Sequence, residues 1–346
     1  MVLVIHGIGT HKPGETKKAI ADGLNQAAKN FGLSDFDVND KVEFFQFNYS
    51  DFLDEIRLKD AKKAGELVDH LSLLKGRGLG EKAASELVEF FSEADEDKFF
   101  NTHWLDVIYY GLMFWGENIR VDLAKKINDL MIEREQGNRK LHIVAHSLGT
   151  AVLHDTLAKL FRKDTDITSK VPHLDVDRFK IDSIWTVANV SRLVNLLNDI
   201  ADPNESIVSC DSDGCTSEFY NIKNEFDPFT WFKEYKRPIN HGGRHIKVKT
   251  IREIDTHDLK EYMEAPNVAE AFLENVLDIS ISEEQYIQGV SKHASTSINN
   301  SYEELKATFD NLHKQDEPMD KFKAILAIVE AADSFQEKVT EMMDQA

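Results

Sequence analysis

The chain of 346 residues contains only two cysteines and no apolar run long enough to cross a bilayer. Cys210 and Cys215 lie close together in a polar stretch, which is not the disulfide framework of a small secreted domain. A membrane-spanning helix needs roughly 18 or more apolar residues. The longest candidate, Trp104 to Trp115, is shorter and contains Asp106. We therefore expect a protein of a reducing compartment, without a transmembrane segment.

Positive charge is also scarce, because 41 Lys and Arg face 61 Asp and Glu, for a net charge of −20. A field of this sign repels nucleic acid and anionic lipid surfaces, so we expect no nucleic-acid partner. At the start of the chain, Met1 leads directly into the apolar run Val2–Ile5 with no basic segment before it. This pattern predicts that the chain has no signal peptide and is cytoplasmic.

Short apolar runs alternate with helical patterns through most of the chain. Such alternation indicates βαβ units and a parallel sheet with right-handed crossovers. We expect strands at residues 2–5, 42–49, 141–146, 179–190, 216–223 and 245–254, and helices at 15–30, 118–135, 193–200 and 268–277.

Two further regions have helical patterns without strands. Residues 51–116 contain apolar helical stripes separated by the glycine-rich break Gly76–Gly80. This region is either a packed insertion that covers the sheet or a lid with a hinge at that break. Residues 281–346 form a helical extension in which we see no chemistry. It either packs on the main domain, residues 1–280, or contacts a protein partner.

Ser147 interrupts the apolar run that begins at Leu141, and a helical pattern follows it at once. A strand, a serine and a helix in this order are the layout of a nucleophile elbow, in which a sharp turn exposes the hydroxyl. The turn needs small residues two places before and after the serine, and Ala145 and Gly149 are there. The alternative interpretation is a buried strand followed by a helix with an ordinary N-cap serine.

A serine hydroxyl becomes a nucleophile only beside a base that a third group holds in the correct tautomer. Asp227 is the best acid, because it follows the strand at 216–223 and precedes Pro228. His257 is the best base, because it follows the last strand. His146, next to Ser147, is more simply structural. The competing acids and histidines are Asp202, Asp211, Asp213, His241 and His245.

Acyl transfer also needs amide donors for the oxyanion. One donor should be the N–H of Leu148, at the start of the helix after Ser147. The other should come from the loop after the first strand, at Ile8 or Gly9, because His6-Gly7 places a small residue opposite the serine turn.

These residues together resemble the α/β-hydrolase superfamily, in particular its lipase and serine-esterase branch. The resemblance covers about residues 1–277 and depends on His6–Gly9, Ala145–Gly149, Asp227 and His257. It implies a doubly wound, mostly parallel sheet and a covalent acyl-enzyme that needs no cofactor. It assigns Ser147 as nucleophile, Asp227 and His257 as its acid and base, and Ile8 and Leu148 as oxyanion donors. The helical insertion, the extension and the lack of strands before Val2 depart from the superfamily.

The sequence thus predicts a serine hydrolase that cleaves a carboxylic ester, of lipid acyl type in view of the aromatic insertion. Two alternatives stay open: an amidase or thioesterase with the same triad, and a hydrolase-like binding or assembly subunit. The segment Asp211–Gly214 resembles the start of a calcium loop but lacks the glutamate that such a loop needs. We therefore expect no metal site.

Overall fold

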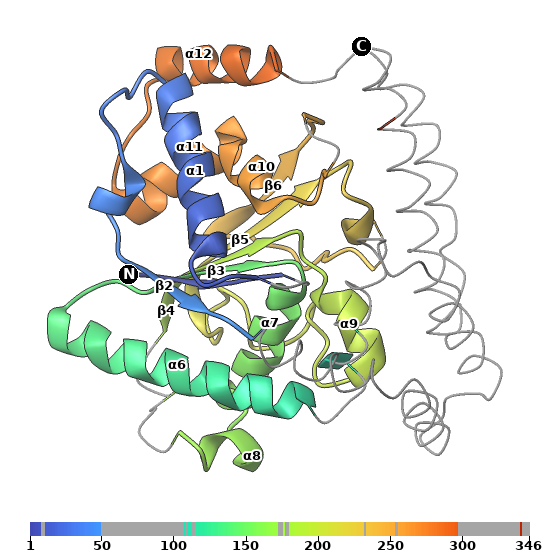
Figure 1. The fold of residues 1–346 in the computed structure, drawn as a ribbon. Coiled ribbons are helices and arrows are strands. Elements are labelled where there is room, and N and C mark those ends of the chain that lie inside the picture. The colour runs from blue at the N-terminus through green and yellow to red at the C-terminus, as the bar shows by residue number, and fades with distance from the viewer. Residues whose placement is uncertain are drawn as a thin grey trace.

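The computed structural model describes residues 1–7, 11–49, 107, 110–111, 115–171, 176, 180–231, 233–252, 255–296 and 340. Within these ranges, six strands form one sheet in the order β2-β1-β3-β4-β5-β6, and every neighbouring pair is parallel (Figure 1). The strands are β1 (Val2–Ile5), β2 (Phe44–Phe47), β3 (His142–His146), β4 (Ile181–Val187), β5 (Thr216–Asn224) and β6 (Gly243–Val248). The expected α/β fold with a parallel sheet is confirmed.

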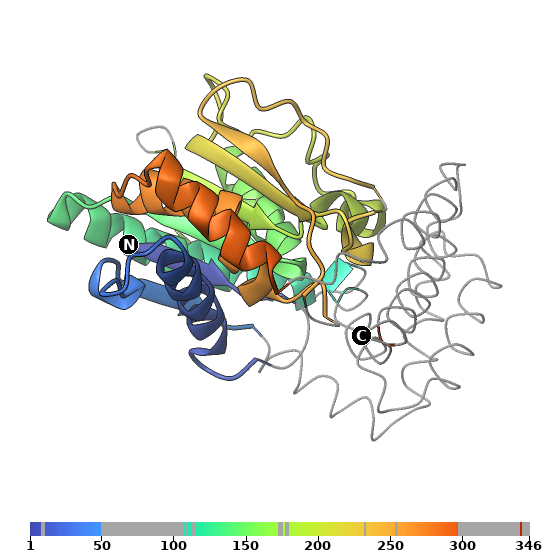
Figure 2. The same cartoon turned by 90° about the horizontal axis from the view of Figure 1, so that it is seen from above.

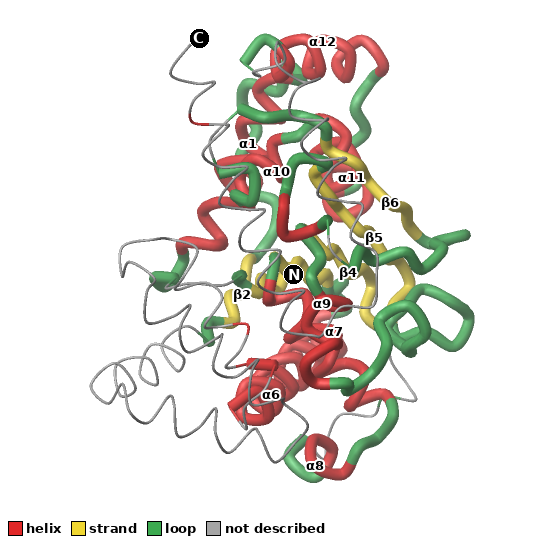
Figure 3. The backbone as a smooth tube through the Cα atoms, turned by 90° about the vertical axis from the view of Figure 1, so that its right-hand side faces the viewer, coloured by secondary structure: helices red, strands yellow, loops and turns green. Residues whose placement is uncertain are grey.

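Helices cover both faces of this sheet (Figures 1 and 3). On one side lie α6 (Trp115–Gly137), α7 (Leu148–Phe161) and α9 (Ser191–Asn198), with the short α8 (Thr165–Thr168) beyond them. The other side carries α1 (Glu15–Asn30), α10 (Leu259–Glu264) and α11 (Pro266–Leu277), and α12 (Glu283–Ala294) lies outside these, as the view from above shows (Figure 2). The described residues also contain the 3-10 turns η1 (Val38–Asp40) and η3 (Pro228–Thr230).

The two faces of β1 explain why the sheet needs both helical layers. Leu3 and Ile5 join the apolar core beneath α6 and α7, while Val2 and Val4 join the core beneath α1 and α11. Because alternate side chains of a strand point to opposite faces, a strand that is apolar at every position must be buried on both. All four side chains of β1 are fully buried.

The bounds of β6 differ from the strand expected at 245–254. It starts two residues earlier, at Gly243, and ends at Val248. The reason is pairing: β6 bonds only to β5, and Asn224, the last residue of β5, pairs with Val248. Beyond Val248, Ile251 lies outside the strand, although its side chain is still buried.

The expected insertion and extension lie largely outside the described residues. Of 51–116, the structure describes only 107, 110–111 and 115–116, so the lid stays a prediction. Of 281–346, it describes mainly α12, on which Ile287 and Val290 are exposed. A partner contact through this region stays a prediction as well. Among the described helices, none is both long and apolar enough to span a membrane.

Candidate active site

Ser147 connects β3 to α7 in a single residue with a rare backbone conformation. Its φ is 51° and its ψ is −126°, a region that favours glycine. Two hydrogen bonds hold the turn: the Ser147 N–H donates to the carbonyl of Val187 over 2.9 Å, and its carbonyl accepts from the N–H of Thr150 over 2.8 Å. Strained residues of this kind occur mainly at functional sites. Ser147 therefore lies in a strained turn between β3 and α7, and its role as a nucleophile stays a prediction.

Two glycines allow the elbow to lie against the end of β1. A Cβ atom on Gly149 would overlap the carbonyl oxygen of His6 and lie 2.9 Å from that of Ile5. A Cβ atom on Gly7 would lie 2.9 Å from the Cβ of Ser147. Ile5 pairs with Ala145 in the sheet, so Gly7 stands opposite Ser147, as the sequence suggested. The first turn of α7 thus packs so closely on His6 and Gly7 that positions 7 and 149 have no space for a side chain.

Asp227 and His257 are in direct contact although 30 residues separate them. The Nδ1 atom of His257 lies 2.7 Å from the Oδ2 atom of Asp227. Asp227 is completely buried, and its other oxygen accepts the N–H of Phe229 over 3.0 Å at the start of η3. A carboxylate at Nδ1 selects the tautomer in which Nε2 carries no proton and can accept one. Among the described residues, Nε2 of His257 has no hydrogen-bond partner.

The charge around His257 favours its protonated form. Burial lowers the pKa of the imidazole, but the charge and hydrogen bond of Asp227 oppose this, and Asp255 and Asp258 add to them. The net effect raises the pKa above its ordinary value of 6.5. His257 is therefore a stronger base than a free imidazole, as a general base for a hydroxyl proton should be.

His146 holds the backbone of His257 in place. Its Nε2 atom lies 2.9 Å from the carbonyl oxygen of His257, and the two rings are 4.8 Å apart. Burial and the neighbouring His257 lower the pKa of His146 well below its ordinary value, so this ring is neutral and donates through Nε2. The structural role expected for His146 agrees with these contacts, and they bring His257 next to the residue that precedes Ser147.

Ser147 and His257 are linked through His146 rather than by a direct hydrogen bond. Ser147 follows His146 in the chain, and His257 packs on His146, so both lie beyond the carboxyl end of β3. Among the described residues, no hydrogen bond joins the Ser147 hydroxyl to the His257 ring. Catalytic hydrogen bonds of free enzymes are often long and tighten only when substrate is bound.

The two proposed oxyanion donors differ in what the structure describes. Leu148 is the first residue of α7, and the first N–H groups of a helix have no partner within it. Ile8 lies outside the described residues, as does Gly9. Of the residues before Ile8, His6 and Gly7 are held by Tyr49, whose hydroxyl contacts their carbonyl oxygens at 3.0 and 2.9 Å.

Three of the five competing acids and histidines have other partners. His245 lies near the amino end of β6, whereas Ser147 lies past the carboxyl end of β3. The Nε2 atom of His245 bonds the carbonyl oxygen of Arg237. Asp211 forms an ion pair with Arg237 over 2.6 Å. Asp202 is exposed, and its side chain accepts the N–H of Asn204 in a turn. None of these three contacts His257 in the part of the chain that the structure describes.

A second serine, histidine and aspartate form a chain that the sequence did not predict. The Ser206 Oγ atom lies 2.8 Å from Nε2 of His154, whose Nδ1 lies 3.2 Å from Oδ1 of Asp155. Ser206 does not have a positive φ and does not begin a helix, so it lacks the strained turn and the amide donors of Ser147. Asp155 also accepts from Tyr110 and Asn198, which is typical of a satisfied buried network.

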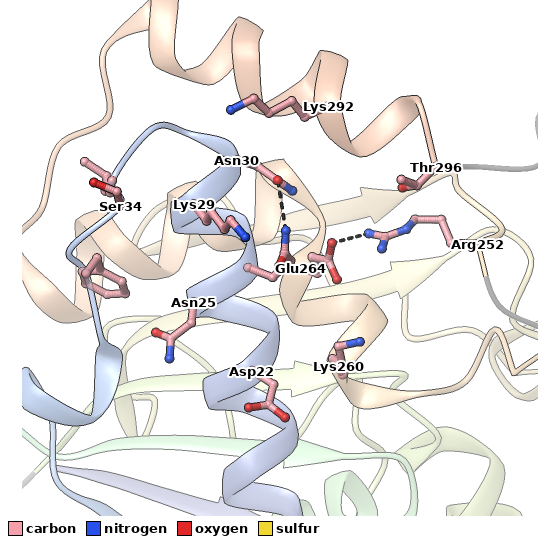
Figure 4. Close-up of a pocket in the computed structure, with 13 residues that line it drawn as sticks. Asp22, Asn25, Lys29, Asn30, Ser34, Arg252, Lys260, Glu264, Lys292 and Thr296 are labelled. Atoms are coloured by element: carbon pink, nitrogen blue, oxygen red, sulfur yellow. Dashed lines mark hydrogen bonds and ion pairs between the residues drawn. The ribbon is translucent and has the colours of Figure 1, made fainter.

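The described surface also has a polar pocket of about 580 Å³ away from these residues. It lies between α1, α10 and α12, and Figure 4 shows Lys29, Lys260 and Lys292 around it. At one side, Arg252 forms an ion pair with Glu264. Ser147, Asp227 and His257 are not among its lining residues, so its position does not identify the candidate active site.

Both cysteines are free, and the described residues contain no group of three or more His, Cys, Asp or Glu side chains placed to bind a metal ion. Comparison with protein-family models finds no match to this sequence, and comparison with curated proteins finds none either. The fold and the contacts of Ser147, Asp227 and His257 are therefore the basis for any statement about function.

Proposed function

We propose that the chain is a serine hydrolase of the α/β-hydrolase type, similar to lipases and serine esterases, that cleaves a carboxylic ester. Ser147 is the nucleophile, His257 the general base and Asp227 the acid that orients it. One observation carries the proposal: a serine with a positive φ at a strand–helix junction directly follows His146, and the ring of His257, paired with the buried Asp227, packs on that His146. The alternative of an ordinary N-cap serine does not need that conformation.

The proposed chemistry uses this pair twice. His257 accepts the Ser147 hydroxyl proton at Nε2 while Oγ attacks the carbonyl carbon of the ester. The resulting oxyanion is stabilised by the N–H groups of Leu148 and Ile8. Collapse of this intermediate breaks the ester bond, and the alcohol leaves with the proton from His257. Water then attacks the acyl carbon while His257 takes its proton. Collapse of this second intermediate breaks the bond to Ser147 Oγ, which regains the proton from His257, and the carboxylic acid leaves.

The test is labelling of the full chain with a fluorophosphonate, which reacts with activated serines. Ser147→Ala should abolish labelling and lower hydrolysis of p-nitrophenyl acetate by at least about 10³. The matched control is Ser206→Ala, which removes a serine whose hydroxyl contacts His154. We expect Ser206→Ala to label like the wild type.

Equal labelling of wild type and Ser147→Ala would contradict the proposal, and loss of labelling only in Ser206→Ala would move the nucleophile to that residue. The corresponding p-nitroanilide and thioester substrates separate the ester from the amide and thioester alternatives. The proposal predicts the largest kcat/KM for the ester.

A further inference from the structure

Tyr262 reaches the candidate active site from the helix that follows His257. The helix α10 begins at Leu259, and the Asp258 side chain caps it by accepting the N–H groups of Lys260 and Glu261 over 2.7 and 3.2 Å. The start of α10 is thus fixed directly after His257. One turn later, Tyr262 returns to Asp227, and its hydroxyl lies 2.6 Å from the Oδ2 atom of that residue.

The same oxygen of Asp227 also accepts from His257. Oδ2 therefore receives two side-chain donors, at 2.7 Å from Nδ1 of His257 and at 2.6 Å from the Tyr262 hydroxyl. The Asn224 N–H donates to the Tyr262 oxygen over 3.1 Å, which leaves the phenolic hydrogen to point at Asp227. Tyr262 is only 1% exposed, so bulk water cannot readily replace its hydroxyl.

We infer that Tyr262 is a positioning residue of the proposed triad, whose hydroxyl shares the Asp227 carboxylate with His257 and limits how strongly that carboxylate binds the imidazole. This inference rests on the proposed function for its catalytic meaning. The hydrogen bonds on which it depends belong to the protein whatever reaction it catalyses.

The physical reason is the division of charge on one oxygen. A carboxylate oxygen that already accepts a short bond from a neutral phenol is a weaker acceptor for a second donor, and it stabilises an imidazolium less. Tyr262 does not give up its proton, because burial and the Asp227 charge raise its pKa well above the ordinary value. The hydroxyl therefore keeps more of His257 in the neutral form that can act as base.

Other charged and titratable groups also face His257, and they are the same in the wild type and in Tyr262→Phe. They are Asp255 and Asp258 on its own segment, Asp227 after β5, and His146 on β3. Removing only the Tyr262 oxygen therefore isolates its contribution from theirs.

The experiment measures the titration of the His257 ring by NMR on the full chain carrying Ser147→Ala, which removes any catalytic contribution. In this background, Tyr262→Phe should raise the His257 midpoint by about one pH unit, because a hydrogen bond to a charged group is lost. The matched control is Tyr110→Phe. Tyr110 is equally buried and donates to Oδ2 of Asp155 over 2.9 Å, on the other side of the sheet, so it should leave the midpoint unchanged.

A second variant covers the case in which Tyr262→Phe does not fold. Incorporation of 3,5-difluorotyrosine at position 262 makes the hydroxyl a stronger donor and should lower the same midpoint. An unchanged midpoint in either folded variant overturns the inference. With Ser147 restored, the rising limb of kcat/KM against pH should move upward in Tyr262→Phe by the same amount as the NMR midpoint. A shift by NMR without any fluorophosphonate labelling of the wild type would reject the proposed function and keep the contact.

Discussion

Ser147 has a backbone conformation that side chains with a Cβ atom rarely adopt. Strain of this kind costs about 1–3 kcal/mol, and it persists only when the surroundings impose it. Here the bonds to Val187 and Thr150 and the contact with Gly7 impose it. The residue with the greatest backbone strain in the site is also the one to which we assign the covalent step.

Replacement of Ser147 by glycine should therefore stabilise the fold. Glycine adopts a positive φ without strain but costs about 0.5–1 kcal/mol in the entropy of the unfolded chain. We expect Ser147→Gly to exceed Ser147→Ala by about 1 kcal/mol in the free energy of unfolding, measured by urea denaturation. Alanine is the matched control because it also lacks the hydroxyl but keeps the Cβ atom. Equal stabilities would show that the turn is not strained.

At the residue scale, the sequence predicted a contact that an isolated motif could not. Asp227 and His257 were paired from their places after strands, and the structure puts them 2.7 Å apart. Their catalytic roles, like that of Ser147, stay predictions. Tyr262 was missed because a buried tyrosine on a short helix has the pattern of a core residue. Its signal was its position, five residues after the candidate base.

At the scale of elements, parallel strands bring the site together. Ser147 follows β3, Asp227 follows β5, and His257 follows β6, so each candidate residue lies past the carboxyl end of its strand. This arrangement was predictable, since ligands bind at that edge of open α/β sheets. The exact end of β6 was not, because it depends on where β5 stops offering partners rather than on local sequence.

The packing of α7 on β1 gives a prediction for Gly149. Gly149→Ala places a Cβ atom against two backbone carbonyls, of His6 and Ile5, which cannot rotate away. We expect a loss of about 1–3 kcal/mol in the free energy of unfolding, together with reduced fluorophosphonate labelling as the elbow moves.

The control for Gly149 is Gly137→Ala at the end of α6, where the added atom meets only the flexible side chain of Arg139. That change should alter stability by no more than about 0.5 kcal/mol. If both variants unfold at the same urea concentration as the wild type, the junction of α7 with β1 is looser than these contacts indicate.

At the scale of the whole molecule, buried neutral histidines set the response to acid. Burial lowers the pKa of His6 to about 3, and those of His142 and His293 to about 4. It lowers the pKa of His146 further below its ordinary value. Each of these groups takes up a proton more readily in the unfolded chain. Their contribution to stability is therefore complete above pH 6.5 and is lost as the pH falls towards their folded values.

His257 has the opposite sign, because its pKa is raised in the folded state. Its contribution is complete below pH 6.5 and disappears as the pH rises through the folded value. Below pH 6.5 the contribution of His257 no longer changes, so the other four histidines determine the slope, and we expect the free energy of unfolding to fall between pH 6.5 and 5.

The test is urea denaturation of wild type and His142→Asn at pH 7, 6 and 5. His142 contacts the Ser183 hydroxyl through Nδ1 over 2.7 Å, and asparagine keeps a polar atom near that place without titrating. Removal of the His142 imidazole should reduce the slope of the free energy of unfolding against pH by up to about 1.4 kcal/mol per pH unit. Parallel curves for the two proteins would mean that His142 titrates normally in the folded chain.

The separation of Ser147 from the segment 227–262 along the chain has a consequence for biosynthesis. When translation has passed Ser147, the growing polypeptide has the hydroxyl but neither the acid nor the imidazole that we assign to its activation. Asp227 is encoded 80 codons after Ser147 (227 − 147) and His257 110 codons after it (257 − 147), with β5, β6 and α10. On the proposed function, the nascent chain is chemically inert until this last part of the sheet has been synthesised and docked.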